Sequence, residues 1–345
     1  MPQQVDELEP QLVAGEAVIG VDPEVGDELL AVKDTDHDVG VPDVDGEQHG
    51  GECRHQRPVI ALLDIGGTKI AASAGRGARI GAVRRIPTPV EAPLATLRGL
   101  IEGVMGGVLP EAIAISAPGP FDRTTGALRN PPGMPASWHG LEMAYLLGQR
   151  FECPVVVEND ANCAALAEAR LGAGAGHRTV VYWTISTGIG CGVVRDGRIM
   201  VGRHDTEGGH MVLWPAWLGG PPCHCGGAGC LEALASGRSI ARRYGVAPEH
   251  LSDPDAWVEI GRWIGLATVN VTAVHDPDVV IFGGGVCLSW SRFEPSLLET
   301  VQRYLRLQPQ PEIARGTLGE DRSLLGALLI AEDNGEDPAR LLTAR

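Results

Sequence analysis

Lysine is scarce in this sequence, and long apolar runs are missing. Lys33 and Lys69 are the only lysines among 345 residues, whereas arginine occurs 26 times. No run of about 18 apolar residues occurs, so no transmembrane helix is expected. A basic segment followed by an apolar stretch, the pattern of a secretory signal, is also absent. We therefore expect a cytoplasmic protein with no membrane partner.

Cysteine pairing of the secreted kind is absent too. Three of the eight cysteines cluster within residues 223–230, and the others are scattered along the chain. This distribution fits a reducing compartment rather than a disulfide scaffold. With 345 residues, of which 44% are hydrophobic and 21% are charged, the chain is long enough for two α/β domains with substantial cores.

The net charge of −16 is concentrated in the first 57 residues. This segment holds 15 acidic and three basic residues, a charge of −12, and the remainder holds 29 acidic and 25 basic residues. Residues 1–57 show no sustained helical or strand period and are interrupted by Pro23 and Pro42, so we expect a largely disordered acidic leader. A misassigned start codon is an alternative origin for it.

The leader carries a prediction of its own. Deleting residues 2–57 should leave thermal stability and activity close to those of the full chain, because a disordered acidic segment contributes no packing to the folded body. Thermal unfolding and turnover of the two forms, measured side by side, provide the check. A large loss of either quantity in the truncated protein would mean that the leader packs on the body.

The sharpest pattern in the sequence is one histidine followed by three closely spaced cysteines. Thiolates and an imidazole at such spacing, with glycines that let the backbone turn tightly, are typical of a tetrahedral Zn²⁺ site. Four protein ligands leave no position for an activated water, so the ion would be structural. His224 stands between two of the cysteines, but alternation along an extended segment would point it away from the ion. The predicted ligands are His210, Cys223, Cys225 and Cys230.

Two carboxylates flank this loop without being needed as ligands. Glu207 lies three residues before the histidine, and Glu232 lies two residues after the last cysteine. Both could face a polyhydroxylated ligand. The alternative interpretation of the whole loop is a set of free core thiols beside a surface histidine.

A buried strand over residues 59–65 runs into a glycine turn and out again through a second strand. Such a turn exposes backbone amides that can hold phosphate oxygens. Asp64, at the end of the first strand, is placed to hold Mg²⁺ through water. The residues predicted to face phosphate are Gly66, Gly67, Thr68 and Lys69, although Lys69 can equally be a solvated turn lysine.

The design of an apolar strand, a glycine turn and a second apolar strand occurs again over residues 180–194. A third strand and glycine turn follow near residue 280, where a flat nucleotide base can approach the backbone. The repetition suggests two similar α/β halves that close on a nucleotide. The predicted contact residues are Thr187, Gly188 and Gly190 in the second turn and Gly283, Gly284 and Gly285 in the third.

Asp160 lies where a strand over 154–157 meets a helix of small residues that runs through residue 170. In the functional interpretation it is a base, and Asn159 binds a substrate hydroxyl. The alternative is that one of the two only caps the helix. A carboxylate at a helix N-terminus should stay ionised and be a weak base at pH 7. Weakness matters little in phosphoryl transfer, because the hydroxyl proton leaves late.

Five segments together resemble the ROK family (repressors, open reading frames, kinases) of bacterial sugar kinases. They are residues 64–69, 158–162, 186–190, 207–210 and 223–232, which occur in the family's order. The resemblance covers about residues 58–332 and implies a duplicated actin-like ATPase fold of the ribonuclease H-like α/β class. It also implies two domains around a central cleft and transfer of the ATP γ-phosphoryl group to a hexose.

The same resemblance implies roles for single residues. Asp160 would be the catalytic base, Asn159, Glu207, His210 and Glu232 would bind the sugar, and His210 would also join the three cysteines on zinc. We expect a small domain over 58–173, completed by a helix over 321–345, and a large domain over 174–320 that carries the zinc loop. The implied cofactors are ATP, Mg²⁺ and structural Zn²⁺.

Within this family several functions stay open at the level of sequence. A glucokinase that makes glucose 6-phosphate is the reading we favour, and a kinase of N-acetylmannosamine or another N-acetylhexosamine is the second. A transcriptional regulator would need a basic segment before the body, whereas residues 1–57 would be repelled by DNA. A catalytically inactive sugar sensor is disfavoured because Asp64 and Asp160 are present. We expect a sugar as partner, no nucleic acid, and a homodimer or homotetramer.

Overall fold

The structure is a computed structural model that describes residues 59–122, 125–129, 131, 133–202 and 204–334. The expectations for the acidic leader over 1–57, and for the end of the predicted C-terminal helix beyond residue 334, lie outside the described residues. No helix in the described part of the chain is long and apolar enough to cross a membrane.

Two separate sheets organise the chain. The first has the order β3-β2-β1-β5-β6, and β4 also pairs with β2. In this sheet β1 pairs antiparallel with β2 and parallel with β5, which pairs parallel with β6. The strands of this sheet are β1 (Ile60–Ile65), β2 (Lys69–Arg76), β3 (Arg79–Ile80), β4 (Arg84–Pro87), β5 (Ala112–Ala117) and β6 (Val155–Asn159).

The second sheet repeats this design. Its order is β11-β10-β7-β8-β9, in which β7 pairs antiparallel with β8 and parallel with β10, which pairs parallel with β11. A hairpin at one side and parallel strands at the other therefore occur in both sheets, as the repeated glycine turns predicted. The strands are β7 (Thr179–Ile185), β8 (Ile189–Arg195), β9 (Arg198–Ile199), β10 (Val279–Gly283) and β11 (Glu312–Arg315).

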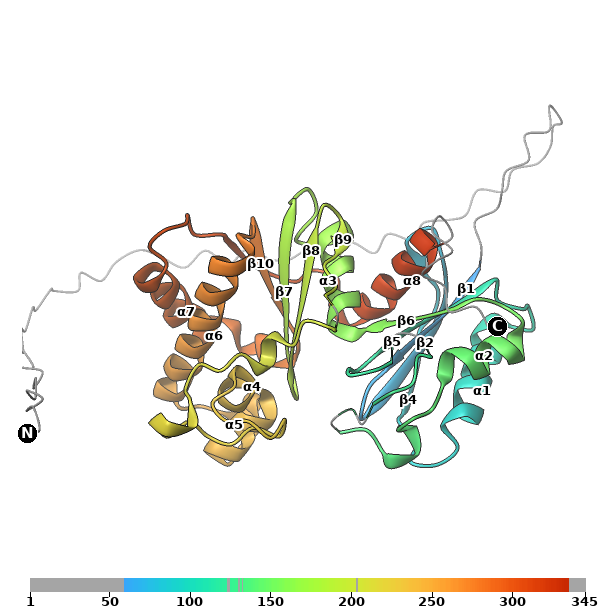
Figure 1. The fold of residues 1–345 in the computed structure, drawn as a ribbon, viewed down its shortest axis with the longest axis horizontal. Helices are drawn as coiled ribbons and strands as arrows, with labels where there is room; N and C mark the ends of the chain where they lie inside the picture. The colour runs from blue at the N-terminus through green and yellow to red at the C-terminus, as the bar shows by residue number, and fades with distance from the viewer. Residues whose placement is uncertain (1–58, 123–124, 130, 132, 203, 335–345) are drawn as a thin grey trace, which may run out of the picture. The chain divides into compact units, whose positions relative to one another are not determined.

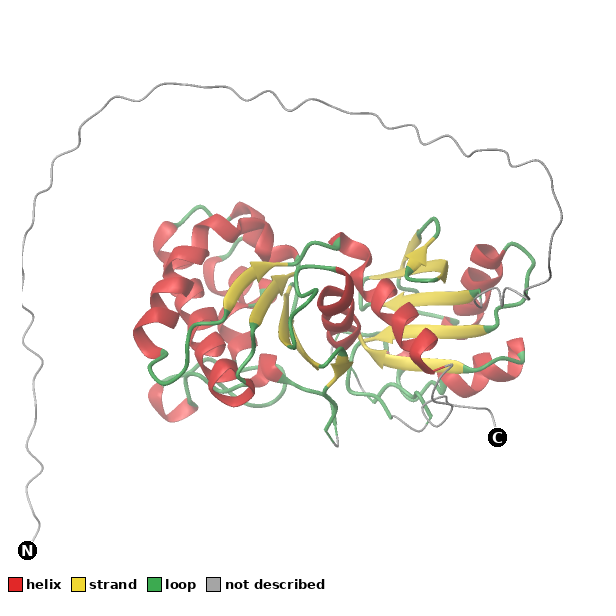
Figure 2. Cartoon of the chain, turned by 90° about the horizontal axis from the view of Figure 1, so that it is seen from above, coloured by secondary structure: helices red, strands yellow, loops and turns green. Residues whose placement is uncertain are grey.

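The strands that lead into the glycine turns are apolar on both faces because helices cover both sides of each sheet. Alternate residues of β1 enter different cores: Leu63 and Ile65 pack toward α1 and α2, and Ile60 and Leu62 pack toward α8. Figure 2 shows the helices grouped beside the strands. The helices are α1 (Pro93–Met105), α2 (Met143–Phe151), α3 (Asp160–Leu171), α4 (Leu231–Ala235), α5 (Gly237–Tyr244), α6 (Pro254–His275), α7 (Trp290–Tyr304) and α8 (Arg322–Asn334).

Helices α3 and α8 pack against each other between the two sheets (Figure 1). Helix α3 follows β6 of the first sheet but packs on β7 and β8 of the second, while α8 follows β11 of the second sheet and packs on the first. Helices α6 and α7 contribute to the core on the other face of the second sheet. This exchange places the beginning of α3, and with it Asp160, beside the hairpin of the second sheet.

One buried carboxylate joins the two segments that cross between the sheets. Glu168 of α3 is fully buried and accepts hydrogen bonds from the backbone N–H of Ala173, in the first crossing segment, at 3.1 Å. It also accepts from the N–H groups of Thr317 and Leu318, in the second, both at 3.1 Å. A buried polar group of this kind is stabilised when several N–H donors point at it. Glu168 thus fixes both crossing segments on α3, a role that its place in the sequence does not reveal.

Candidate active site and metal loop

The four predicted metal ligands meet at one place. One ring nitrogen of His210 and the sulfurs of the three cysteines all lie within 4.8 Å of one another. Cys223 Sγ lies 3.7 Å from His210 Nδ1, and Cys225 Sγ lies 3.8 Å from Cys230 Sγ. A tetrahedral ion with Zn–S bonds of about 2.3 Å requires sulfurs about 3.8 Å apart, which is the separation of Cys225 and Cys230.

His224, left out of the predicted ligand set, is turned toward a carboxylate. Its Nδ1 lies 2.7 Å from Glu232 Oε1, and its ring makes an edge contact with the His210 ring at 5.5 Å. The other oxygen of Glu232 accepts from the backbone N–H of Ile189 at 2.9 Å. The segment of residues 207–232, called the metal loop below, is therefore bonded through Glu232 to the start of β8, beside the second glycine turn. This bond between the two segments was not predicted.

Asn159 and Asp160 occupy different roles at the start of α3. Asn159 is the N-cap, and its side chain accepts from the backbone N–H groups of Ala161 and Asn162 at 2.9 and 3.2 Å. Asp160 is the first residue of the helix, and its carboxylate accepts only from the N–H of Ala161 at 2.8 Å among the bonds within the described residues. Asn159 therefore caps the helix, as the alternative interpretation allowed, and the role of Asp160 as a base stays a prediction.

The expectation of an ordinary, fully ionised Asp160 was wrong. Desolvation, together with the neighbouring charges of Asp64 and Glu207, raises the pKa of Asp160 to about 7. The helix terminus and the Ala161 N–H oppose this shift but do not cancel it. A carboxylate with a pKa near the working pH is a better proton acceptor than the weak base predicted from the sequence.

Glu207 reaches the same region from the metal loop. It precedes the short 3₁₀ turn η2 (Gly208–His210), and a methyl group built on Gly119 would lie 3.1 Å from Asn159 Nδ2 and 3.4 Å from Glu207 Oε1. Desolvation raises the pKa of Glu207, and Asp205 and Glu232 add to the shift. The loop after β5 thus brings Gly119 between two predicted sugar-binding side chains, although no role was assigned to this glycine from the sequence.

Asp64 lies at the end of β1, where the hydroxyl of Ser116 donates to its Oδ1 at 2.6 Å. Desolvation raises the pKa of Asp64, and the Ser116 hydrogen bond lowers it in part. In the glycine turn that follows, the N–H of Gly66 donates to the carbonyl of Lys69 at 2.9 Å, and Thr68 is exposed. The carboxylate is therefore held beside the turn, as the sequence predicted.

Lys69 and Gly67 differ in their availability for phosphate. Lys69 Nζ lies 3.1 Å from Glu320 Oε2, so its charge is paired, although both side chains are exposed. Gly67 is closely approached by another loop, because a methyl group on it would lie 2.7 Å from the carbonyl oxygen of Gly133. The contact of Lys69 with phosphate therefore stays a prediction.

The second and third glycine turns lie together. Thr187 is exposed at the tip of the β7–β8 hairpin, and a methyl group on Gly188 would lie 2.7 Å from Glu232 Oε2. Gly190 contacts α3, since a methyl group there would lie 2.9 Å from the Cβ of Ala161. Because Gly190 has no side chain, α3 can pack closely here, and this brings Asp160 near the hairpin. Two glycines of the third turn, Gly283 and Gly284, pack on β7 through Tyr182 and Ile185, whereas Gly285 faces open space.

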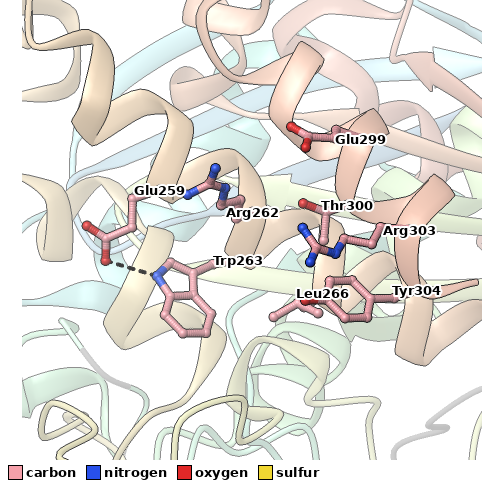
Figure 3. Close-up of a pocket in the computed structure, with 8 residues that line it drawn as sticks. All are labelled: Glu259, Arg262, Trp263, Leu266, Glu299, Thr300, Arg303 and Tyr304. Atoms are coloured by element: carbon pink, nitrogen blue, oxygen red, sulfur yellow. Dashed lines mark hydrogen bonds between the residues drawn. The ribbon is translucent and has the colours of Figure 1, made fainter. Parts of the chain in front are cut away.

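A surface cavity of about 440 Å³ lies between α6 and α7 (Figure 3). None of the predicted site residues lines it. Its walls are Glu259, Arg262, Trp263, Leu266, Glu299, Thr300, Arg303 and Tyr304.

Comparison with known proteins agrees with this arrangement. Residues 60–334 match the model of the ROK family. The structure of a ROK hexokinase from Thermus thermophilus is 38% identical, with a TM-score of 0.73, and the match covers 81% of this chain and 99% of that one. A ROK family glucokinase from Streptomyces griseus, solved with glucose and AMPPNP, is 29% identical, with a TM-score of 0.67, and covers 79% and 98%. An N-acetylmannosamine kinase from Salmonella typhi is 31% identical over 295 residues, 78% of this chain and 97% of that protein.

Two sheets of one design, each with a hairpin whose turn is rich in glycine, define the duplicated actin-like ATPase fold that ROK sugar kinases have. This confirms the predicted fold class. The match over residues 60–334 then places the chain itself in a family: it belongs to the ROK family.

Proposed function

We propose that this chain is a sugar kinase that transfers the γ-phosphoryl group of ATP to the 6-hydroxyl of a hexose, with glucose as the preferred acceptor. The observation that carries the proposal is the burial of Asp160 at the start of α3, where desolvation and the charges of Asp64 and Glu207 raise its pKa to about 7. Glucose and AMPPNP in the Streptomyces griseus relative support the two substrate classes.

In the proposed reaction Asp160 orients the sugar hydroxyl toward the γ-phosphorus. The hydroxyl oxygen forms the new P–O bond, the bond to the β–γ bridging oxygen breaks, and ADP leaves with that electron pair. The hydroxyl proton passes to Asp160 late, as expected for a loose transition state. Asn159, Glu207, His210 and Glu232 bind the other sugar hydroxyls, and Glu232 is held in place by His224 and Ile189.

The nucleotide is assigned to the glycine turns, where Gly66, Gly67, Thr68, Thr187 and Gly188 supply backbone and hydroxyl groups. When bound, Mg²⁺ neutralises charge on the phosphate oxygens. Asp64 would hold it, because carboxylate oxygens are ligands that Mg²⁺ prefers and Asp64 lies beside the first turn.

We also propose that the four ligands of the metal loop hold a structural Zn²⁺, which the sulfur and nitrogen separations fit. His210 would bind the ion through Nδ1 and a sugar hydroxyl through Nε2. A division into a small domain over 58–173 with α8 and a large domain over 174–320, and a dimeric or tetrameric assembly in the cytoplasm, complete the proposal.

Phosphorylation of N-acetylmannosamine is the second candidate, favoured by the similarity to the Salmonella typhi enzyme. A coupled ADP-release assay over glucose, mannose, N-acetylglucosamine and N-acetylmannosamine distinguishes the candidates. We expect the highest kcat/KM with glucose and a product phosphorylated at O6 by phosphorus NMR. A preference for N-acetylmannosamine would transfer the assignment to the second candidate, and no turnover with any hexose would reject a sugar kinase.

A further inference from the structure

Arg238 occupies a position between the two glycine hairpins that its sequence neighbours do not explain. It lies in the first turn of α5, whose backbone is tied to the second hairpin. Gly237 N–H donates to the carbonyl of Ser186 at 2.7 Å, and Arg238 N–H donates to the carbonyl of Thr187 at 3.2 Å. The start of α5 is therefore fixed against the tip of the β7–β8 turn.

The guanidinium of Arg238 extends from there toward the first hairpin. A methyl group built on Gly133 would lie 3.6 Å from Arg238 Nη2, and the same Gly133 carries the carbonyl that closely approaches Gly67. One cationic side chain thus reaches from the turn after β7 to the loop that covers the turn after β1.

The charge of Arg238 has no partner within the described residues. Its side chain is exposed and takes part in no hydrogen bond or ion pair there, whereas Lys69, the cation predicted to reach phosphate, is paired with Glu320. Among the described residues beside both hairpins, Arg238 is therefore the cation that is not paired with a carboxylate.

A cation in the first turn of a helix is also unfavourable for the free protein. The N-terminal end of a helix carries positive partial charge, and α5 has no acidic residue in its first turn to offset it. The N–H groups of residues 237–239 are already bonded to Ser186, Thr187 and Ser236, so an anion at this point would be bound by the side chain. A bound phosphate chain would neutralise this unfavourable positive charge and accept hydrogen bonds from both edges of the guanidinium.

We propose that Arg238 binds the β- and γ-phosphates of the nucleotide between the two hairpins. This assignment rests on the proposed function and names a nucleotide contact that no motif of the sequence indicated. The guanidinium would hold the phosphate chain in line with the sugar hydroxyl on Asp160.

Calorimetric titration of Mg²⁺–AMPPNP and of AMP into wild type, Arg238→Ala and Arg238→Lys tests the assignment. One charge-assisted contact is worth about a tenfold change in affinity or somewhat more. We expect Arg238→Ala to bind AMPPNP about tenfold more weakly, Arg238→Lys to fall between, and AMP binding to be unchanged in both. Arg262→Ala is the matched control, because Arg262 is exposed, lines the cavity between α6 and α7 and has no ion pair within the described residues (Figure 3).

The outcomes separate this assignment from the proposed function. If wild type phosphorylates a hexose and both Arg238 variants bind AMPPNP like wild type, Arg238 does not contact the phosphates and the kinase assignment stands. An equal loss of AMP and AMPPNP affinity would mean a distorted site and would also overturn the assignment. If wild type binds no nucleotide, the proposed function fails and the role of Arg238 fails with it.

Discussion

Asp160→Asn should lower kcat by about a hundredfold or more and leave sugar affinity close to that of wild type. Asparagine keeps the shape of the side chain and can still contact a hydroxyl, but it cannot accept the proton that leaves in the transition state. An interaction made only in the transition state affects kcat rather than ground-state binding. Steady-state kinetics and direct sugar binding by calorimetry, in the absence of nucleotide, measure the two effects separately.

The pH profile gives an independent check on Asp160. Because the base must be ionised, and its pKa is raised to about 7, kcat/KM should rise with pH through the neutral range. At pH 6 only about a tenth of the carboxylate would be ionised in the free enzyme. Mg²⁺ near Asp64 would offset one of the charges that raise this pKa, so the limb should move to lower pH as Mg²⁺ increases.

The matched control is Asp333→Asn. Asp333 pairs with Arg170 at the far end of α3, so the substitution removes the same charge from the same packing unit without touching the site. We expect its pH profile and kcat to match wild type. Turnover of Asp160→Asn within a fewfold of wild type, or an unchanged acidic limb in that variant, would remove Asp160 from the role of base.

The elements that could be predicted from the sequence are those whose signal is local. Strands β1, β7 and β10 are nearly continuous apolar runs that end in glycines, so their type and their turns follow from residues next to each other. The cluster of His210 and three cysteines was predictable for the same reason, since three of its four members lie within eight residues of the chain. Helix α7 was not predicted, because Pro295 interrupts its pattern.

The properties that could not be predicted depend on residues far apart in the chain. Burial raises the pKa of Asp160, and the charges of Asp64 from β1 and Glu207 from the metal loop raise it further, whereas a helix N-terminus considered alone gives the opposite direction. The pairing of Lys69 with Glu320 likewise joins the first turn to the segment before α8. Helices α3 and α8 each pack on the sheet that they do not follow in the chain. The charges that this packing brings together leave no pattern in the sequence.

Cys225→Ser should lose both zinc and sugar phosphorylation, with kcat/KM reduced by at least about a hundredfold. Serine is a poor ligand for Zn²⁺, and without the ion the loop no longer holds His210 and Glu232 in place. Mutation of residues that support a metal site typically lowers metal affinity or activity by ten- to a hundredfold, so the loss of a ligand itself should lower activity further. Zinc content by mass spectrometry and kcat/KM over the sugar panel are the measurements.

The size of this effect follows from how Glu232 connects the metal loop to the rest of the site. Its oxygens hold His224 within the loop and the N–H of Ile189 at the second hairpin, so a disordered loop would disturb the sugar side and the nucleotide side together. Cys153→Ser is the control, because Cys153 lies just beyond α2, partly buried against the core of the first sheet, and this variant should keep zinc and activity. A Cys225→Ser protein that lacks zinc yet retains full turnover would show that the loop keeps its shape without the ion, and the coupling through Glu232 would then need no metal.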